Sequence, residues 1–183
     1  MAQNNKQMNA DLPYREIPAH PKKYSSTNIA ARMIDGLGFR YYWATEGLRP
    51  EDLAYKPSGE ARTSDETLDH ILGLSQVILN AARQVANAPV EKGKMTFAEK
   101  RKKTLENIKA ASDILKNSKK KDLKNMKIIF KRGGKTTEYP YWNMLNGPIA
   151  DAIWHCGQVV SFRRASGNPF DSKASLLTGK LRE

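Results

Sequence analysis

The sequence predicts an all-α fold, a four-helix bundle with a small β-hairpin inserted before the last helix. Four long segments carry apolar residues at spacings of three and four, which is the period of one helix face. Short loops, most of them containing Pro or Gly, separate these segments, as in helix bundles. Between the third and fourth segments, the pattern changes to two β-prone runs joined by a Gly-Gly turn.

We expect one domain over residues 27–170, preceded by a polar arm at 1–26 and followed by a tail at 171–183. A chain of 183 residues is long enough to bury a core without disulfide bonds. The single cysteine, Cys156, excludes an intramolecular disulfide and any zinc motif that needs several cysteines. No apolar run approaches the ~18 residues that a membrane-spanning helix needs.

The first helix is predicted to begin near Ser26 and to end at Arg49-Pro50. Gly36 and Gly38 lie inside it, where each costs about 1 kcal/mol relative to Ala. We therefore expect a close helix contact at these glycines. The predicted apolar face consists of Ile29, Met33, Leu37, Tyr41, Ala44 and Leu48.

The second helix is predicted to begin after Thr63, which has the spacing of a capping box with Glu66. We expect it to extend to about Ala86. Its apolar face is predicted to consist of Thr67, His70, Ile71, Leu74, Val77, Ile78 and Ala81.

The net charge of +12 is concentrated in one segment. Residues 92–127 hold 13 Lys and Arg and four acids, which gives +9, whereas the other 147 residues carry +3. Within this segment Thr96 and Glu99 form a second capping box, which predicts an amphipathic third helix. We interpret the charge as a solvated helix face followed by the basic run at 119–121. The alternative is a polyanion-binding or nucleic-acid-binding patch, which we disfavour because Phe97 is the only aromatic residue of the segment.

A β-hairpin is predicted over residues 126–139, with Gly133-Gly134 as its turn. The fourth helix is predicted to begin near residues 146–148, where a proline suits the first turn. Its end is predicted at the Gly-Asn-Pro of residues 167–169, since glycine commonly terminates a helix and proline cannot continue it.

Two imidazoles and one carboxylate are predicted to meet between the second and fourth helices. Asp151 and His155 lie four residues apart and project from one helix face, and His70 can complete the set from the second helix. Such a set leaves coordination positions open, which is typical of a divalent Zn, Ni, Fe or Mn site. A metal of this kind generates a nucleophile from water or binds a thiolate. The alternative is a buried His–Asp hydrogen bond without a metal.

Four residues near these candidates have both a structural and a functional interpretation. Gln158 either orients His155 through a hydrogen bond or packs between helices. Cys156 is interpreted as a small buried hydrophobe, with a reactive thiol as the alternative. Arg163 and Arg164 lie near the helix C-terminus, where cations are favoured by the helix dipole, and anion binding is the alternative.

Two stretches of the chain resemble the DinB-like (DinB/YfiT) family, over about residues 27–170. They are Ser-Asp-Glu-Thr-Leu-Asp-His-Ile at 64–71 and His-Cys-Gly-Gln at 155–158, the latter followed by Arg163-Arg164 and Gly167-Asn168-Pro169. The resemblance implies a four-helix bundle with a divalent metal held by three side chains. Carried onto this chain, the ligands are His70, Asp151 and His155. The family commonly has His at the position of Asp151, so the carboxylate is a departure from its pattern.

The resemblance also implies a function, because characterised relatives include transferases and isomerases that use low-molecular-weight thiols. We therefore expect a metal-dependent transferase or hydrolase with a small-molecule substrate, including thiol-conjugated ones. No catalytic residue beyond the candidate ligands stands out. The carboxylate at position 151 keeps a second hypothesis open, a non-catalytic stress or interaction bundle, as a monomer or a homodimer. We expect no membrane or nucleic-acid partner, and a cytoplasmic protein, or an exported periplasmic one if a leader has been removed.

Overall fold

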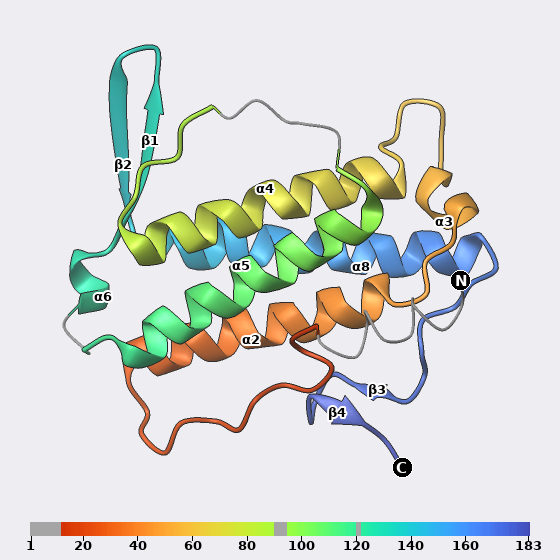
Figure 1. The fold of residues 1–183 in the computed structure, drawn as a ribbon, viewed down its shortest axis with the longest axis horizontal. Helices are drawn as coiled ribbons and strands as arrows, with labels where there is room; N and C mark the ends of the chain where they lie inside the picture. The colour runs from red at the N-terminus through yellow and green to blue at the C-terminus, as the bar shows by residue number, and fades with distance from the viewer. Residues whose placement is uncertain (1–11, 90–94, 120–121) are drawn as a thin grey trace.

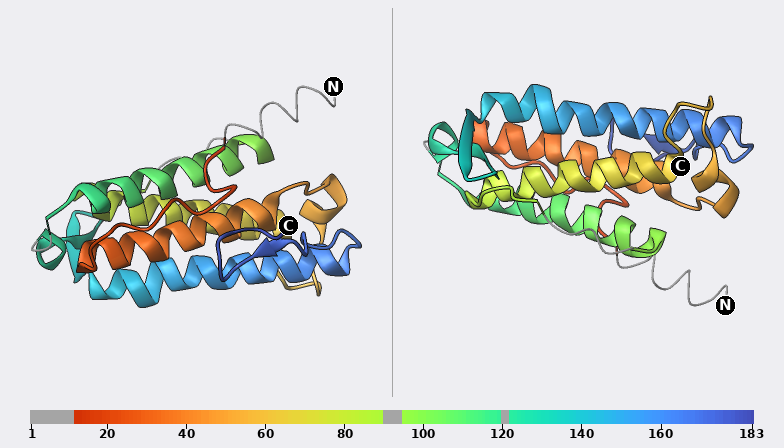
Figure 2. Two further views of the ribbon diagram at one scale, coloured as in Figure 1. Left: turned by 90° about the horizontal axis from the view of Figure 1, so that it is seen from below. Right: turned by 90° about the horizontal axis from the view of Figure 1, so that it is seen from above.

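The computed structural model describes residues 12–89, 95–119 and 122–183, and its structure is mostly helical. Its four long helices are α2 (Ser26–Thr45), α4 (Ser64–Arg83), α5 (Phe97–Asn117) and α8 (Ala150–Ala165). Helices α2 and α4 each pack against both α5 and α8, and Figures 1 and 2 show the four lying side by side. The predictions of a mostly helical chain and of an antiparallel hairpin before its last helix are both confirmed.

The shorter elements lie between and after the long helices. They are α3 (Pro50–Ala54), α6 (Asp122–Asn125), β1 (Lys127–Arg132), β2 (Lys135–Pro140), α7 (Trp142–Met144), a π-helical segment (Leu145–Ile149), β3 (Ala174–Ser175) and β4 (Lys180–Leu181). Figure 1 shows the β1–β2 hairpin projecting from one end of the helical body. No helix of the described ranges is both long enough and apolar enough to cross a lipid bilayer.

Both predicted capping boxes are present and begin α4 and α5. The Glu66 amide donates to Thr63 Oγ1 at 3.1 Å, and the Thr63 amide donates to Glu66 Oε2 at 2.7 Å. Thr96 and Glu99 make the same reciprocal pair, at 3.3 and 2.7 Å. These contacts satisfy backbone donors that have no partner within the helix, so the capping pair determines where each helix begins.

Helix α2 differs from its prediction in its end and in its buried face. It ends at Thr45, before the Arg49-Pro50 end that the sequence predicted, and Gly47 follows with a φ of +69°. Ile29 and Met33, predicted to face the core, are exposed. The hydrophobic residues that α2 does bury are Ala30, Ala31, Ile34, Leu37, Phe39, Tyr41, Tyr42, Trp43 and Ala44. The buried face is wide because α2 packs on α5, on α8 and under the N-terminal arm.

The described part of the arm is bound to α2 through Tyr14, whereas residues 1–11 of the predicted arm lie outside the described ranges. A Cβ atom on Gly38 would lie 2.4 Å from the Tyr14 ring, so the close contact expected at this glycine is with the arm and not with another helix. The Tyr14 hydroxyl donates to Asp35 Oδ1 at 3.0 Å. Ser112 and Lys116 of α5 contact the same carboxylate, at 2.6 and 2.8 Å. Burial, together with the Asp35 charge, raises the pKa of Tyr14 above its usual value.

The C-terminal tail pairs with the arm. The Ile17 amide donates to the Gly179 carbonyl at 2.8 Å, and Gly179 has a φ of +70°. A Cβ on Gly179 would lie 2.6 Å from Ile17, so only glycine fits this position without movement. In Figure 2 (left) the tail, with β3 and β4, lies over α2 and α8. Arm and tail together therefore cover part of one side of the helical body.

The β1–β2 turn and the end of α8 both follow the sequence prediction. Gly133 and Gly134 have φ values of +52° and +76°, as a two-residue type I′ turn requires. Gly167 follows α8 with a φ of +81°, and the Asn168 amide donates to the Arg163 carbonyl at 2.8 Å. These glycines adopt conformations that other residues rarely accept, which explains why the sequence predicts both features.

Candidate metal site

His70 of α4 meets Asp151 and His155 of α8, as the sequence predicted. His70 Nε2 lies 3.2 Å from Asp151 Oδ2, and His155 Nε2 lies 3.2 Å from Asp151 Oδ1. The two imidazole rings lie edge to face, with centroids 4.6 Å apart and planes at 89°. One ligand atom from each of the three side chains lies within 4.8 Å of the other two, a separation that allows all three to hold one metal ion.

The three side chains are more exposed than the predicted core position implies. The exposed fractions are 34% for His70, 38% for Asp151 and 15% for His155. The apolar neighbours on the same helix, Ala152 and Cys156, are buried beneath them. The cluster therefore lies at the edge of the core, in contact with solvent.

The backbone before α8 is irregular, and this irregularity determines where α8 begins and therefore where Asp151 lies. The fourth helix was predicted to start near residues 146–148, but a π-helical segment precedes it at Leu145–Ile149. Gly147 has non-helical dihedral angles within this segment (φ −94°, ψ −109°), and Pro148 lacks an amide donor. Asp151 then falls in the first turn of α8, facing α4.

Gln158 determines which nitrogen of His155 is available to a ligand. His155 Nδ1 lies 2.7 Å from Gln158 Oε1, and because that oxygen is an acceptor, Nδ1 carries the proton. The Nε2 atom then faces Asp151 Oδ1 with a lone pair, opposite another acceptor. A metal ion bound by both atoms would replace this contact between two acceptors. This arrangement matches metal-binding histidines, whose second nitrogen is held by a hydrogen bond.

Cys156 follows His155 in the chain but points into the core. Its side chain is buried, and burial raises the pKa of the thiol to about 12. A thiol with so high a pKa is neither a nucleophile nor a metal ligand near neutral pH. The interpretation of Cys156 as a small buried hydrophobe is the one that the structure supports.

The second half of the motif, at the C-terminal end of α8, is bound to the fold. The guanidinium of Arg163 donates to the Trp43 and Ala44 carbonyls, each at 3.1 Å, and to Asn168. The side-chain amide of Asn168 donates to Asp52 Oδ2 at 2.6 Å. Burial lowers the pKa of Arg163 from its usual value, although it remains the donor of these bonds. The structure therefore gives Arg163 a structural role in place of the anion-binding alternative.

The basic segment contains many intramolecular ion pairs. Lys100 is buried between Asp65 and Asp69, at 2.7 and 3.0 Å. Burial lowers the pKa of Lys100, but the two carboxylates outweigh it and raise the pKa above its usual value. Further ion pairs within the described ranges are Arg101–Glu46, Lys102–Glu106, Lys109–Asp113, Lys116–Asp35 and Lys127–Glu138.

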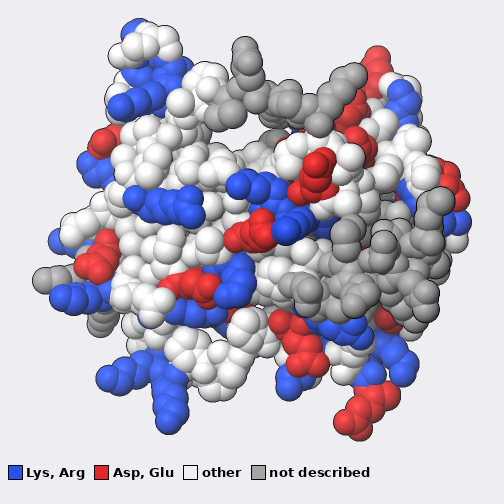
Figure 3. Space-filling model, viewed as in Figure 1, with Lys and Arg blue, Asp and Glu red and all other residues white. Residues whose placement is uncertain are grey.

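Positive and negative side chains are accordingly interleaved over α5, as Figure 3 shows. In the predicted basic run at 119–121, Lys120 and Lys121 lie outside the described residues. The described part of this segment is thus less available to a polyanion than its net charge suggested.

Comparison with known proteins finds no matching family model, no similar curated protein and no similar solved structure. The resemblance to the DinB-like family is therefore carried by the quoted residues alone.

Proposed function

We propose that the protein binds one divalent metal ion through His70, Asp151 and His155, and that it is a DinB-like four-helix bundle. The single observation that carries this proposal is the convergence of three ligand atoms within 4.8 Å, with His155 oriented by Gln158. Packing of α2 and α4 against both α5 and α8 supports the bundle. Zn, Ni, Fe and Mn all accept two imidazoles and one carboxylate.

For the activity, we infer a metal-dependent transferase or hydrolase acting on a small substrate, including thiol-conjugated ones. Three ligands leave coordination positions open, and an ion held in this way acts as a Lewis acid toward a substrate or a water. The partial exposure of His70 and Asp151 supports access from solvent. His155 and Gln158 would hold the ligand set in one orientation.

A non-catalytic bundle is the second candidate, and one observation favours it. Within the described ranges, the side chain outside the three candidate ligands that hydrogen-bonds to the cluster is Gln158. Its amide is neither an acid nor a base. A transferase or hydrolase would then need its general acid or base from the substrate or from bound water.

The metal site is tested on protein purified without a histidine tag, stripped with chelator and titrated calorimetrically with Zn²⁺, Ni²⁺, Mn²⁺ or anaerobic Fe²⁺. We expect one ion per chain. At a free-metal concentration of 100 times Kd the stabilisation is about 2.7 kcal/mol, which raises Tm by roughly 5–10 °C for a chain of this size.

The matched control is His20→Ala, which removes the third histidine of the chain, an exposed residue of the arm. His70→Ala and His155→Ala are expected to abolish the rise in Tm, whereas His20→Ala retains it. If the wild-type protein binds none of the four ions, or if His70→Ala binds as tightly as the wild type, the proposed site is wrong.

A further inference from the structure

A second feature of the molecule lies on the side of α8 that faces α2. Tyr24 and Leu177 are 96% and 94% exposed, and Ile29, Met33 and Leu176 are exposed next to them in the hollows described below. Exposed apolar side chains gathered in one place usually mark a binding surface. No sequence pattern singled out this surface, because it combines the arm, α2, α8 and the tail.

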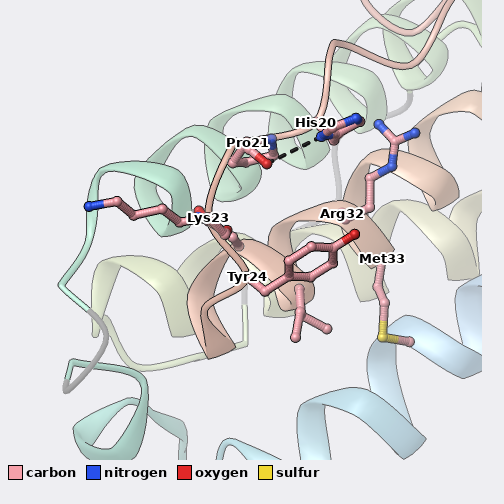
Figure 4. A pocket seen from close by; sticks show the side chains of 8 residues that line it. His20, Pro21, Lys23, Tyr24, Arg32 and Met33 are labelled. Atoms are coloured by element: carbon pink, nitrogen blue, oxygen red, sulfur yellow. Dashed lines mark hydrogen bonds between the residues drawn. The ribbon is translucent and has the colours of Figure 1, made fainter.

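Two adjoining hollows lie among these residues and share Arg32 and Met33 in their walls. One has a volume of about 350 Å³ and is lined by Tyr24 and Ile29. The other has a volume of about 310 Å³ and extends to Leu177 and the tail. Together they form a groove, called here the α2 groove, whose size is that of a small-molecule site. Figure 4 shows Tyr24 and Met33 beside the first hollow, under the arm segment that carries His20 and Pro21.

The charged groups at the α2 groove are arginines. Arg32 donates to the Pro18 carbonyl at 2.8 Å, and Arg40 donates to the Gly36 carbonyl at 3.0 Å. Neither guanidinium has a carboxylate within ion-pair distance among the described residues, and neither hollow has an acid in its lining. Lys23 extends away from the other labelled side chains in Figure 4, so Arg32 and Arg40 are the cations that remain for a ligand.

Gly36 lets Arg40 reach this position. A Cβ on Gly36 would lie 3.3 Å from Arg40 Nη1, closer than an ordinary van der Waals contact. A guanidinium with unused donors presents the planar fork that matches a carboxylate. The α2 groove therefore offers apolar walls for a hydrocarbon chain and two cations for an anionic head group.

We propose that the α2 groove binds one molecule of a medium-chain fatty carboxylate, with its head group on Arg32 and Arg40. A second copy of the chain fits less well, because a two-fold interface joins the same patch of both copies and the lining of this patch holds arginines but no acid to pair with them. The site is separate from the candidate metal cluster: Ile153 lines the groove, and at about 100° per residue it lies on the other side of α8 from Asp151.

The proposal is tested by isothermal titration calorimetry with laurate, below its critical micelle concentration, on the full chain. Dodecanol and dodecyltrimethylammonium serve as neutral and cationic analogues. We expect saturable one-to-one binding of laurate, with dodecanol at least about tenfold weaker because a charged hydrogen bond is lost. Arg32→Gln and Arg40→Gln should each weaken laurate binding about tenfold, and Gly36→Ala should weaken it by displacing Arg40.

Two control variants match these changes. Arg164→Gln removes an exposed arginine outside the groove, and Val85→Asp matches Leu177→Asp at another exposed apolar residue. We expect Leu177→Asp to abolish binding and both controls to bind laurate as the wild type does. Circular dichroism melts of every variant separate loss of binding from loss of folding.

Three outcomes would overturn the proposal. The first is an absence of saturable laurate binding by the folded wild-type protein. The second is equal affinity for laurate and dodecanol with no effect of the arginine variants, which would indicate non-specific apolar binding. The third is self-association, measured by sedimentation, that Leu177→Asp abolishes, which would make the groove an interface between copies. None of these outcomes depends on the metal site, so the two proposals fail separately.

Discussion

The two ends of α8 carry the two halves of one sequence resemblance, but their side chains have different surroundings. At the N-terminal end, Asp151 and His155 are partly exposed and contact His70 across the helix pair. At the C-terminal end, Arg163 is 4% exposed and donates to backbone carbonyls of α2 and to Asn168. The first set has coordination capacity left for a ligand, whereas the second set has its donors occupied by the fold. A short motif can therefore combine candidate ligands with residues that stabilise the structure.

The largest expected effect is on the C-terminal end, with Arg163→Met. The substitution leaves the Trp43 and Ala44 carbonyls without their guanidinium donor, and an unsatisfied buried polar group costs about 1–3 kcal/mol. We expect the free energy of unfolding to fall by about 3–5 kcal/mol. A calorimetric melt should show Tm lower by roughly 6–20 °C.

The neighbouring arginine supplies the control for this experiment. Arg164 is exposed and belongs to the same pair in the sequence, so Arg164→Met should change stability by less than about 0.5 kcal/mol. Equal losses in the two variants would show that burial does not separate their roles. The comparison between the two ends of α8 would then lose its physical basis.

The lowered pKa of Asp52 predicts that the stability of the protein depends on pH through contacts at the same end of α8. Hydrogen bonds from Arg49, and then from Ser166 and Asn168, hold the pKa of Asp52 well below its usual range. A carboxyl with a lowered pKa in the folded state contributes stability above its unfolded-state pKa of about 3.9, and that contribution is lost as pH falls toward the folded-state pKa.

The measurement is urea unfolding of the wild type and Asp52→Asn from pH 7 to pH 3. We expect the wild type to be more stable by about 2 kcal/mol above pH 5, since hydrogen bonds to a charged group contribute on this scale. The difference should shrink below about pH 4. A difference that stays constant down to pH 3, or that grows, contradicts the assigned direction of the pKa shift.

The N-terminal end is probed with Gln158→Leu, which removes the acceptor at 2.7 Å from His155 Nδ1. Loss of a side chain that orients a metal-binding histidine typically lowers metal affinity about 10–100-fold. We expect this loss in a calorimetric titration with Zn²⁺, together with little change in the Tm of the metal-free protein. Gln158→Glu restores an acceptor and is expected to recover most of the affinity. If Gln158 only packs between helices, the metal-free Tm falls and the affinity does not.

The sequence predicted the starts of α4 and α5 and the shared helix face of Asp151 and His155, because each depends on residues close together in the chain. The approach of His70 depends in addition on the packing of α4 against α8. Thr63 and Glu66 make their capping contacts within one turn, and Asp151 and His155 share a face by their spacing alone. The mostly helical fold and the hairpin follow from the same local rules. These are the features for which short-range geometry is sufficient.

The features that the sequence did not predict depend on contacts between distant segments. The buried face of α2 was predicted as one stripe, but the helix packs on α5, on α8 and on the arm, so Ala30 and Gly38 are core positions while Ile29 and Met33 are exposed. The Tyr14–Gly38 contact and the α2 groove need the arm and tail in place, and no periodicity reports their path. The irregular start of α8 was also not predicted, because the expected start at residues 146–148 falls inside the irregular segment Leu145–Ile149 and α8 begins at Ala150.

The smallest expected effect concerns Cys156, which lies between the two ends of α8. It is adjacent in sequence to His155, yet burial raises its pKa to about 12. We expect a thiol-reactive dye at pH 8 to label the native protein only at the rate of unfolding, and to label it quickly in urea. Fast labelling of the native protein, unchanged when unfolding is slowed by added metal, would mean that solvent reaches past the ligand set into the core. The partly exposed cluster would then be the entrance to a deeper opening. The solvent-accessible part of α8 would extend to Cys156 and would not stop at His155.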